Sequence, residues 1–196
     1  AVADYLAAHG RLSPAAAALR SVNTVAVGAD GVLEGHSTDG AGLVESLVAA
    51  GVEIAGASVC LAGGGGAARA IADALARCGA AQIAVRNRSR PAAEATAAIA
   101  AALGIGARVV EVHDSAAVAA ADIVINATSV GMGVAPGTAP AGSDLERAAA
   151  AVDPSAIHGG QVVVDIVYHP RRTVLLEAAE RAGATTVDGL GMLVHQ

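Results

Sequence analysis

From residue 58 onward, short apolar runs alternate with alanine-rich segments, and this alternation limits the possible folds more than any other feature. The apolar runs have the length and the β-branched content of strands that are buried on both faces. They cover 58–63, 82–87, 108–112, 122–127, 162–167 and 185–189. The segments between them predict helices over 67–79, 91–104, 114–121, 144–151 and 173–183. Buried strands that alternate with helices are typical of an α/β fold, so we expect a doubly wound parallel sheet over 58–188.

The first 57 residues follow another pattern. Their predicted elements are two short helices within 1–20, strands over 21–27 and 32–37 around a turn at 28–31, and a helix over 39–51. Ser13 and Pro14 are residue types that commonly open a helix, here the second of the two short ones. We interpret residues 1–38 as the end of a smaller α/β domain, and residues 39–57 as a helix that links this domain to the sheet.

Four consecutive glycines, Gly63 to Gly66, lie between the first strand and the first helix of the predicted sheet. Gly63, Gly65 and Ala68 fit the dinucleotide fingerprint G-x-G-x-x-G/A in the strand–turn–helix context that this motif requires. The first glycine permits the tight turn, the second lets the backbone approach a pyrophosphate, and the alanine keeps the helix close to the strand. The helix N-terminus then faces the phosphates. This context favours a Rossmann-like dinucleotide site over the alternative, a flexible surface loop.

The end of the second strand indicates which dinucleotide is bound. An NAD site usually has an acidic residue there, about 20 residues after the glycines, to hold the ribose 2′-hydroxyl. Here the corresponding residues are Asn87, Arg88 and Ser89, and none is acidic. A guanidinium matches a phosphate in geometry and in charge, whereas a carboxylate repels it. The sequence therefore predicts NADP, with Arg88 at the 2′-phosphate and one or both of Arg86 and Arg90 as solvated surface charges.

The composition disfavours several other classes of function. The formal net charge is −6, and no basic cluster extends beyond 86–90, so we expect no nucleic acid and no anionic membrane as a partner. No uninterrupted apolar stretch reaches the ~18 residues of a membrane-spanning helix, and we expect no secretion signal. Cys60 and Cys78 form no disulfide framework and favour the reducing cytoplasm. No two histidines have metal-ligand spacing, so no metal is expected.

Taken in order along the chain, seven motifs resemble the shikimate dehydrogenase family. They are VNT (22–24), STDGAG (37–42), GGGGAARA (63–70), NRS (87–89), DIVINATSVGM (122–132), DIVYHP (165–170) and DGLGMLVHQ (188–196). The resemblance implies a substrate-binding domain before an NADP domain, with residues 189–196 beginning a helical return to the former. It implies a cytoplasmic oxidoreductase of aromatic amino-acid biosynthesis that reduces the small molecule 3-dehydroshikimate to shikimate by hydride transfer. The oligomeric state, monomer or homodimer, stays open.

The resemblance also implies roles for individual residues. Asp39 is expected to be catalytic, as the acidic half of a lysine–aspartate pair. The residues expected to bind substrate are Asn23, Asp39, Tyr168 and Gln196. Those expected at the pyrophosphate are Gly63, Gly64, Gly65, Gly66 and Ala67; those at the adenosine end are Asn87, Arg88 and Ser89; those at the nicotinamide are Asn126, Thr128, Ser129, Gly189 and Met192.

Several of these residues have a simpler structural interpretation. Asn23 could bond its own turn, Asp39 could be a helix N-cap, and Gln196 could be a frayed end. Tyr168 could be a half-buried core ring. Met132, inside a motif, is interpreted as apolar packing.

The sequence departs from the family pattern at several positions. The family usually has asparagine at Ser37, an aromatic residue at Leu43, and a second basic residue near Ala92, for which Arg90 is the only substitute. The catalytic lysine of the family would precede Ala1, and the sequence contains no lysine. We therefore expect a piece of a longer protein that lacks a segment at both ends. The alternatives are a quinate or aminoshikimate dehydrogenase, or a non-catalytic NADP-binding module.

Overall fold

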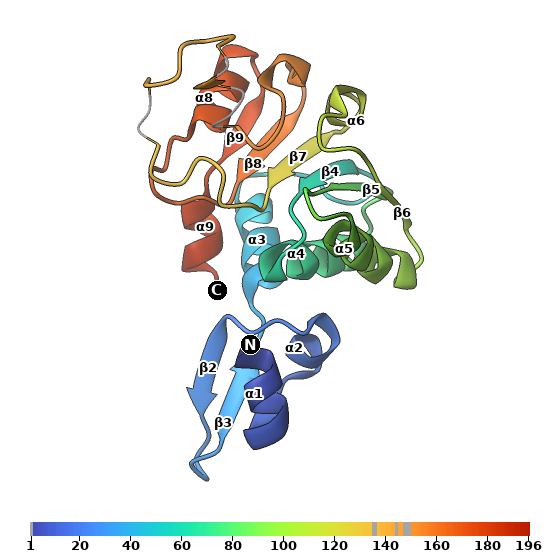
Figure 1. Cartoon of the computed structure of the whole chain (residues 1–196), viewed down its shortest axis with the longest axis vertical. Coiled ribbons are helices and arrows are strands. Elements are labelled where there is room, and N and C mark those ends of the chain that lie inside the picture. The colour runs from blue at the N-terminus through green and yellow to red at the C-terminus, as the bar shows by residue number, and fades with distance from the viewer. Residues whose placement is uncertain (1, 135–136, 144, 147–149) are drawn as a thin grey trace.

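The computed structural model describes residues 2–134, 137–143, 145–146 and 150–196. Within them, the larger sheet has six parallel strands in the order β6-β5-β4-β7-β8-β9 (Figure 1). The strands are β4 (Ser58–Ala62), β5 (Gln82–Arg86), β6 (Gly106–Val109), β7 (Ile123–Asn126), β8 (Val162–Asp165) and β9 (Thr185–Val187). The predicted Rossmann-like parallel sheet is confirmed.

The chain starts this sheet in the middle and builds it outward in two directions. From β4 it adds β5 and β6 on one side, and then β7, β8 and β9 on the other. The order therefore reverses between β4 and β7, and open α/β sheets bind ligands beside the carboxyl ends of the strands at such a reversal. The strands that end there finish at Ala62, Arg86 and Asn126.

Helices cover both faces of the sheet, which is why its strands are apolar on both sides. One face packs Leu61, Ile83 and Ile125 into a core with helices α3, α4 and α5. The other face packs Val124 and Val163 against α6 and α8. The helices are α3 (Asp39–Ala49), α4 (Gly66–Arg77), α5 (Arg90–Ala102), α6 (Ser115–Ala119), α8 (Val174–Arg181) and α9 (Gly189–Val194), with a short 3₁₀ turn η1 (Pro154–Ala156).

The N-terminal part forms its own small sheet at one end of the molecule (Figure 1). Its elements are α1 (Val2–His9), β1 (Arg11–Leu12), α2 (Pro14–Leu19), β2 (Thr24–Val27) and β3 (Leu33–His36). The antiparallel pair β2–β3 and the helix opened by Ser13, whose side chain accepts a hydrogen bond from the backbone N–H of Ala16, are as predicted. Strand β1 was not predicted, because two residues show no periodicity and only pairing with β3 defines it.

Two predicted elements need correction or lie partly outside the description. The strand predicted over 108–112 is β6 at Gly106–Val109, because Gly106 pairs with Gln82 and Val109 with Val85 of the neighbouring strand. The helix predicted over 144–151 includes Asp144 and 147–149, which lie outside the described residues. No helix in the described ranges is long and apolar enough to cross a membrane.

Candidate active site

A cleft of about 630 Å³ opens at the reversal of strand order. Its walls come from the glycine turn and from the loops after β5, β7 and β8. The first residue of α3, helix α9 and Gln196 complete them. Twelve residues singled out from the sequence line it, namely Asp39, Gly63, Gly64, Gly65, Ala67, Asn87, Thr128, Ser129, Tyr168, Gly189, Met192 and Gln196. Five others do not, namely Asn23, Gly66, Arg88, Ser89 and Asn126. The cleft therefore joins the predicted cofactor and substrate residues in one cavity.

The glycine turn is packed on one side and open on the other. Gly63 has φ +139°, and a Cβ there would lie 2.7 Å from the carbonyl oxygen of Ala127. A Cβ on Gly64 would lie 2.9 Å from the Cβ of Ala92. At Gly65, by contrast, no heavy atom lies within 4 Å of an added Cβ, although this residue lines the cleft and caps the N-terminus of α4. The turn is thus held by close packing, unlike a flexible loop, and leaves space for a ligand at Gly65.

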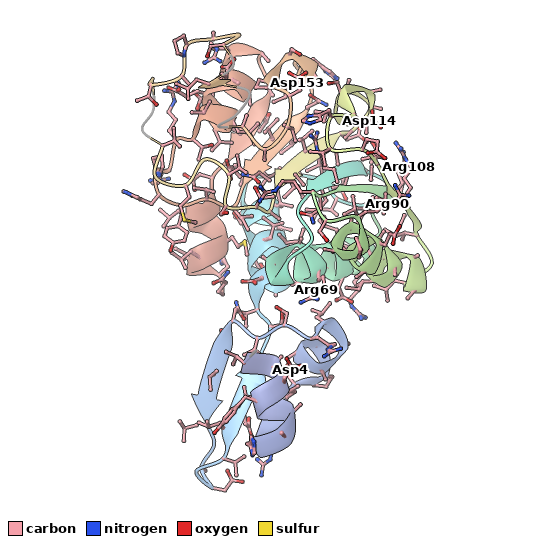
Figure 2. All side chains as sticks on the ribbon, viewed as in Figure 1. Asp4, Arg69, Arg90, Arg108, Asp114 and Asp153 are labelled. Carbon is pink, nitrogen blue, oxygen red and sulfur yellow. The ribbon has the colours of Figure 1, made fainter. Side chains whose placement is uncertain are left out.

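Gly66 lacks a side chain for a different reason. A Cβ there would lie 2.4 Å from the Oγ of Ser21, and Gly66 does not line the cleft. The guanidinium of Arg69 donates a hydrogen bond to the carbonyl oxygen of Arg20 at 3.3 Å in the same region (Figure 2). Gly66 therefore lets the N-terminal part approach α4. Because Gly66 does not line the cleft, the structure gives no support to its expected role at the pyrophosphate.

A second cavity of about 360 Å³ adjoins the first through Asn87, Thr128 and Ser129. Arg88 lines it and is exposed, and no salt bridge of Arg88 is found among the described residues. Ser89 lines neither cavity, and its backbone carbonyl accepts a hydrogen bond of 3.0 Å from Asn87 Nδ2. Arg88 is therefore the member of the NRS motif that is free to meet an anion.

The two arginines beside this motif behave differently. Arg90 is exposed and paired with Glu94 at 3.0 Å and Glu111 at 3.5 Å, so it is the expected surface charge. Figure 2 shows it on the outer side of the sheet domain, near Arg108. Arg86, the last residue of β5, is buried in the wall of the second cavity, and this burial lowers the pKa of its guanidinium. Arg90 is thus occupied elsewhere and does not replace the basic residue that the family has near Ala92.

Asn126 organises the wall of the cleft without reaching the cavity. It is fully buried, and its Oδ1 accepts hydrogen bonds from the N–H and the hydroxyl of Thr128 at 2.9 and 2.7 Å. Its Nδ2 donates to the carbonyl oxygen of Val130 at 3.1 Å and to Asp165 Oδ1 at 2.8 Å. The side chain of Asn126 therefore does not line the cleft, because all its polar atoms are used within the protein, and its expected place at the nicotinamide stays a prediction.

Asp39 and Gln196 line the cleft and meet Asn23 from a third, distant part of the chain. Asp39 Oδ1 accepts a hydrogen bond of 2.7 Å from Asn23 Nδ2 and one of 2.8 Å from Gln196 Nε2. Asn23 Oδ1 accepts from the backbone N–H of Thr38 at 2.9 Å, so Asn23 joins two segments and does not merely bond its own turn. Burial raises the pKa of Asp39, and the hydrogen bond from Asn23 opposes this effect.

These contacts decide between the interpretations left open by the sequence. Asp39 is the first residue of α3 and Thr38 occupies the N-cap position, so Asp39 is not the N-cap. Gln196 is held by Asp39 and is not a frayed end. Tyr168 and Met132 line the cleft with 51% and 55% of their surface exposed, so neither is a core residue. The interpretation of Met132 as apolar packing was wrong, although its place inside the motif at 122–132 was a signal.

Known proteins match this chain over almost its whole length. The family model described as Shikimate / quinate 5-dehydrogenase matches residues 44–139. The NADP⁺ shikimate dehydrogenase of Methylobacterium radiotolerans is 42% identical over 189 residues, which cover 94% of this chain and 62% of that protein. The chain belongs to the shikimate dehydrogenase family.

Solved structures of the family agree with this fold. Shikimate 5-dehydrogenase from Listeria monocytogenes, in complex with shikimate and NAD, has a TM-score of 0.80 and 34% identity over 98% of this chain and 66% of that one. Quinate dehydrogenase from Corynebacterium glutamicum, in complex with NAD, has a TM-score of 0.82 and 32% identity over 98% of this chain and 65% of that one. The chain spans about 62% of the length of the curated relatives it matches.

The structure shows the surroundings of three positions where the sequence departs from the family pattern. Leu43, where the family usually has an aromatic ring, is 2% exposed in the core beneath α3 and does not line the cleft. Ala92 lies against Gly64, so the basic residue that the family has near this position has no counterpart in the cavity wall. The hydroxyl of Ser37 is buried without a hydrogen-bond partner among the described residues.

Proposed function

We propose that this protein is an NADP-dependent dehydrogenase that reduces 3-dehydroshikimate to shikimate in aromatic amino-acid biosynthesis. The observation that carries the proposal is a single cleft lined both by the glycine turn and by Asp39 and Gln196, which meet Asn23 through hydrogen bonds to Asp39. A hydride can pass from a cofactor to a substrate only if both are held in one cavity in a fixed orientation.

The described residues fit a dinucleotide. Gly65 leaves space at the N-terminus of α4, where backbone N–H groups and the helix dipole attract the pyrophosphate. Gly63, Gly64 and Ala67 shape the rest of that turn. Arg88 is exposed beside the second cavity, and no acidic residue at 87–89 would repel a 2′-phosphate, so NADP is favoured over NAD. Thr128, Ser129, Gly189 and Met192 would then surround the nicotinamide, which supplies the hydride when bound.

The other part of the cleft fits a substrate that is rich in hydroxyl groups. The Asp39 carboxylate accepts hydrogen bonds, while Asn23 and Gln196 hold it in place through their amides. Tyr168 adds an exposed phenol at the same cavity. In the family a lysine pairs with this aspartate as the proton donor, and the sequence contains no lysine. We therefore expect this 196-residue chain to bind NADP(H) and to turn over shikimate poorly or not at all.

The domain organisation is part of the proposal. Residues 1–38 would be the end of a substrate-binding domain, 39–57 a linking helix, 58–188 the NADP domain, and 189–196 the start of a return to the substrate domain. Close helix contacts support the linking role, since a Cβ on Gly40 would lie 2.3 Å from the carbonyl oxygen of Ala70, and one on Gly42 would lie 2.7 Å from that of Met192. The free thiols of Cys60 and Cys78 suit the cytoplasm.

The similarity to quinate dehydrogenase supports a second candidate, a dehydrogenase that acts on quinate. Aminoshikimate and a purely NADP-binding role remain further alternatives. A substrate panel on the full-length protein, with shikimate, quinate and aminoshikimate and with NADP⁺ and NAD⁺, separates them. Oxidation of quinate with NAD⁺ in preference to shikimate with NADP⁺ would overturn the first proposal.

The first test is a calorimetric titration of this chain with NADP⁺ and with NAD⁺. We expect NADP⁺ to bind more tightly, and Arg88→Ala to weaken NADP⁺ about 10-fold with little change for NAD⁺, because the guanidinium meets only the extra phosphate. Arg108→Ala is the matched control, since Arg108 is exposed and lines neither cavity. A preference for NAD⁺, or an equal loss in both variants, would contradict the assignment of Arg88.

A further inference from the structure

One buried carboxylate outside the cleft is not used by the proposed function. Asp165 is the last residue of β8, is fully buried, and is absent from the walls of both cavities. Among the described residues it forms no salt bridge. A buried carboxylate without a cation is costly unless several hydrogen bonds stabilise it, so its presence calls for an explanation.

Three donors from three different segments stabilise this carboxylate. Asn126 Nδ2 donates to Oδ1 at 2.8 Å, the backbone N–H of Val167 donates to Oδ1 at 3.0 Å, and the Thr173 hydroxyl donates to Oδ2 at 2.7 Å. Asn126 and Asp165 are paired in register at the ends of neighbouring parallel strands, so their side chains lie next to each other on the same face. Burial raises the pKa of Asp165 to about 6, and the three hydrogen bonds oppose that effect.

These bonds connect two loops that both line the cleft, one after β7 and one after β8. On one side, Asn126 holds Thr128 and Val130, and the loop that follows contributes Thr128, Ser129 and Met132 to the cavity. On the other side, Asp165 holds Val167, whose neighbours Ile166 and Tyr168 line the cavity. Thr173, which also caps α8 through the N–H of Leu176, anchors the carboxylate to a helix.

We infer that Asp165 is a positioning residue that holds the loops after β7 and β8 at a fixed separation, and thereby shapes the nicotinamide end of the cleft. This inference rests on the function proposed above, because that function places the nicotinamide between these loops. Among the described residues, Asp165 forms no hydrogen bond with the glycine turn or with Arg88, so the adenosine half of the cofactor should depend on it less than the nicotinamide half.

The test compares the whole cofactor with its adenosine half. NADP⁺ and adenosine 2′,5′-bisphosphate are titrated into the wild type, Asp165→Ala and Asp165→Asn at pH 8 and at a temperature where each variant is folded. We expect Asp165→Ala to weaken NADP⁺ about 10-fold or more, and the half-ligand less than about 3-fold, since only the nicotinamide end loses its support. Asp165→Asn keeps an acceptor for Asn126 and Val167 and should restore most of the NADP⁺ affinity.

Gln161→Ala is the matched control. Gln161 directly precedes β8, at the amino end of the strand that Asp165 ends, and is 2% exposed. Its side chain donates to the carbonyl oxygens of Val118 and Ala121 at 2.8 Å each. Its loss should lower stability without changing the ratio of the two affinities. Equal weakening of both ligands by Asp165→Ala, or no weakening of either, would overturn the inference. If Asp165→Ala does not fold, Thr173→Val removes one donor and should shift the ratio in the same direction.

Amide hydrogen exchange in the ligand-free chain separates this inference from the proposed function. The amides of Thr128 and Val167 donate directly into the network and should exchange faster in Asp165→Ala than in Gln161→Ala. Failure of the wild type to bind either ligand would sink the proposed function, whereas unchanged exchange at these two amides would sink the role of Asp165.

Discussion

Two parts of the cleft are built in different ways. In the part proposed for the dinucleotide, backbone at Gly63, Gly64, Gly65 and Ala67 lines the cleft, and its shape depends on missing side chains. In the part proposed for the substrate, the side chains of Asn23, Asp39 and Gln196 meet from three segments, and Gln196 is 157 positions from Asp39. A backbone site therefore depends on local conformation, whereas a side-chain site depends on how distant elements pack. The two parts should respond differently to substitution.

The largest effect is expected at Gly63, where Gly63→Ala places a Cβ 2.7 Å from the carbonyl oxygen of Ala127 in a backbone with φ +139°. Strain and overlap together should lower the free energy of unfolding by about 4 kcal/mol. Urea unfolding measures this loss, and NADP⁺ binding should disappear with it. A variant as stable as the wild type would show that the turn can move, which would weaken the contrast between the two parts.

Gly65→Ala sharpens the comparison, because no protein atom lies within 4 Å of the added Cβ. Unfolding free energy should change by less than about 1 kcal/mol, since Gly65 has an ordinary φ of −84°. NADP⁺ should bind about 10-fold more weakly, because the methyl group would occupy the space that we propose for the pyrophosphate. Unchanged affinity, measured by calorimetry, would mean that the phosphates do not approach this residue.

The smallest effect is expected in the part proposed for the substrate. Asn23→Ala removes the hydrogen bonds to Asp39 and Thr38, which should cost about 1 kcal/mol of stability and leave NADP⁺ affinity unchanged. The pKa of Asp39 should rise further, because the bond from Asn23 lowers it, and carboxyl chemical shifts followed against pH measure this. Thr24→Ala is the control, since Thr24 makes only long contacts of 3.4 Å there. A fall in the pKa would contradict the observed network.

Much of the larger sheet could be predicted from local pattern. Apolar runs of strand length, helices between them, and glycines at the turn are each properties of a few neighbouring residues, and the predicted strands differ from the observed ones mainly at their ends. The strand β6 shows the limit, because its position follows from pairing with β5 and not from its own residues. The two-residue strand β1 likewise exists only through β3.

The candidate site could be predicted as a set of residues more readily than as a set of roles. Gly66 and Asn126 belong to motifs, yet one makes room for Ser21 and the other bonds within the protein. Met132 was assigned to the core and lies at the cleft instead. A motif identifies which positions matter, but the direction of a side chain depends on the face of the strand and on the neighbouring elements.

By itself, the sequence determined the fold class, the dinucleotide turn and the absence of an acidic residue after β5, because each depends on residues that are adjacent in the chain. Only the tertiary structure decided that Asp39 meets Asn23 and Gln196, that Arg86 is buried while Arg88 is exposed, and that Asp165 connects two loops. These features depend on which distant segments the packed helices and the strand register bring within hydrogen-bond distance.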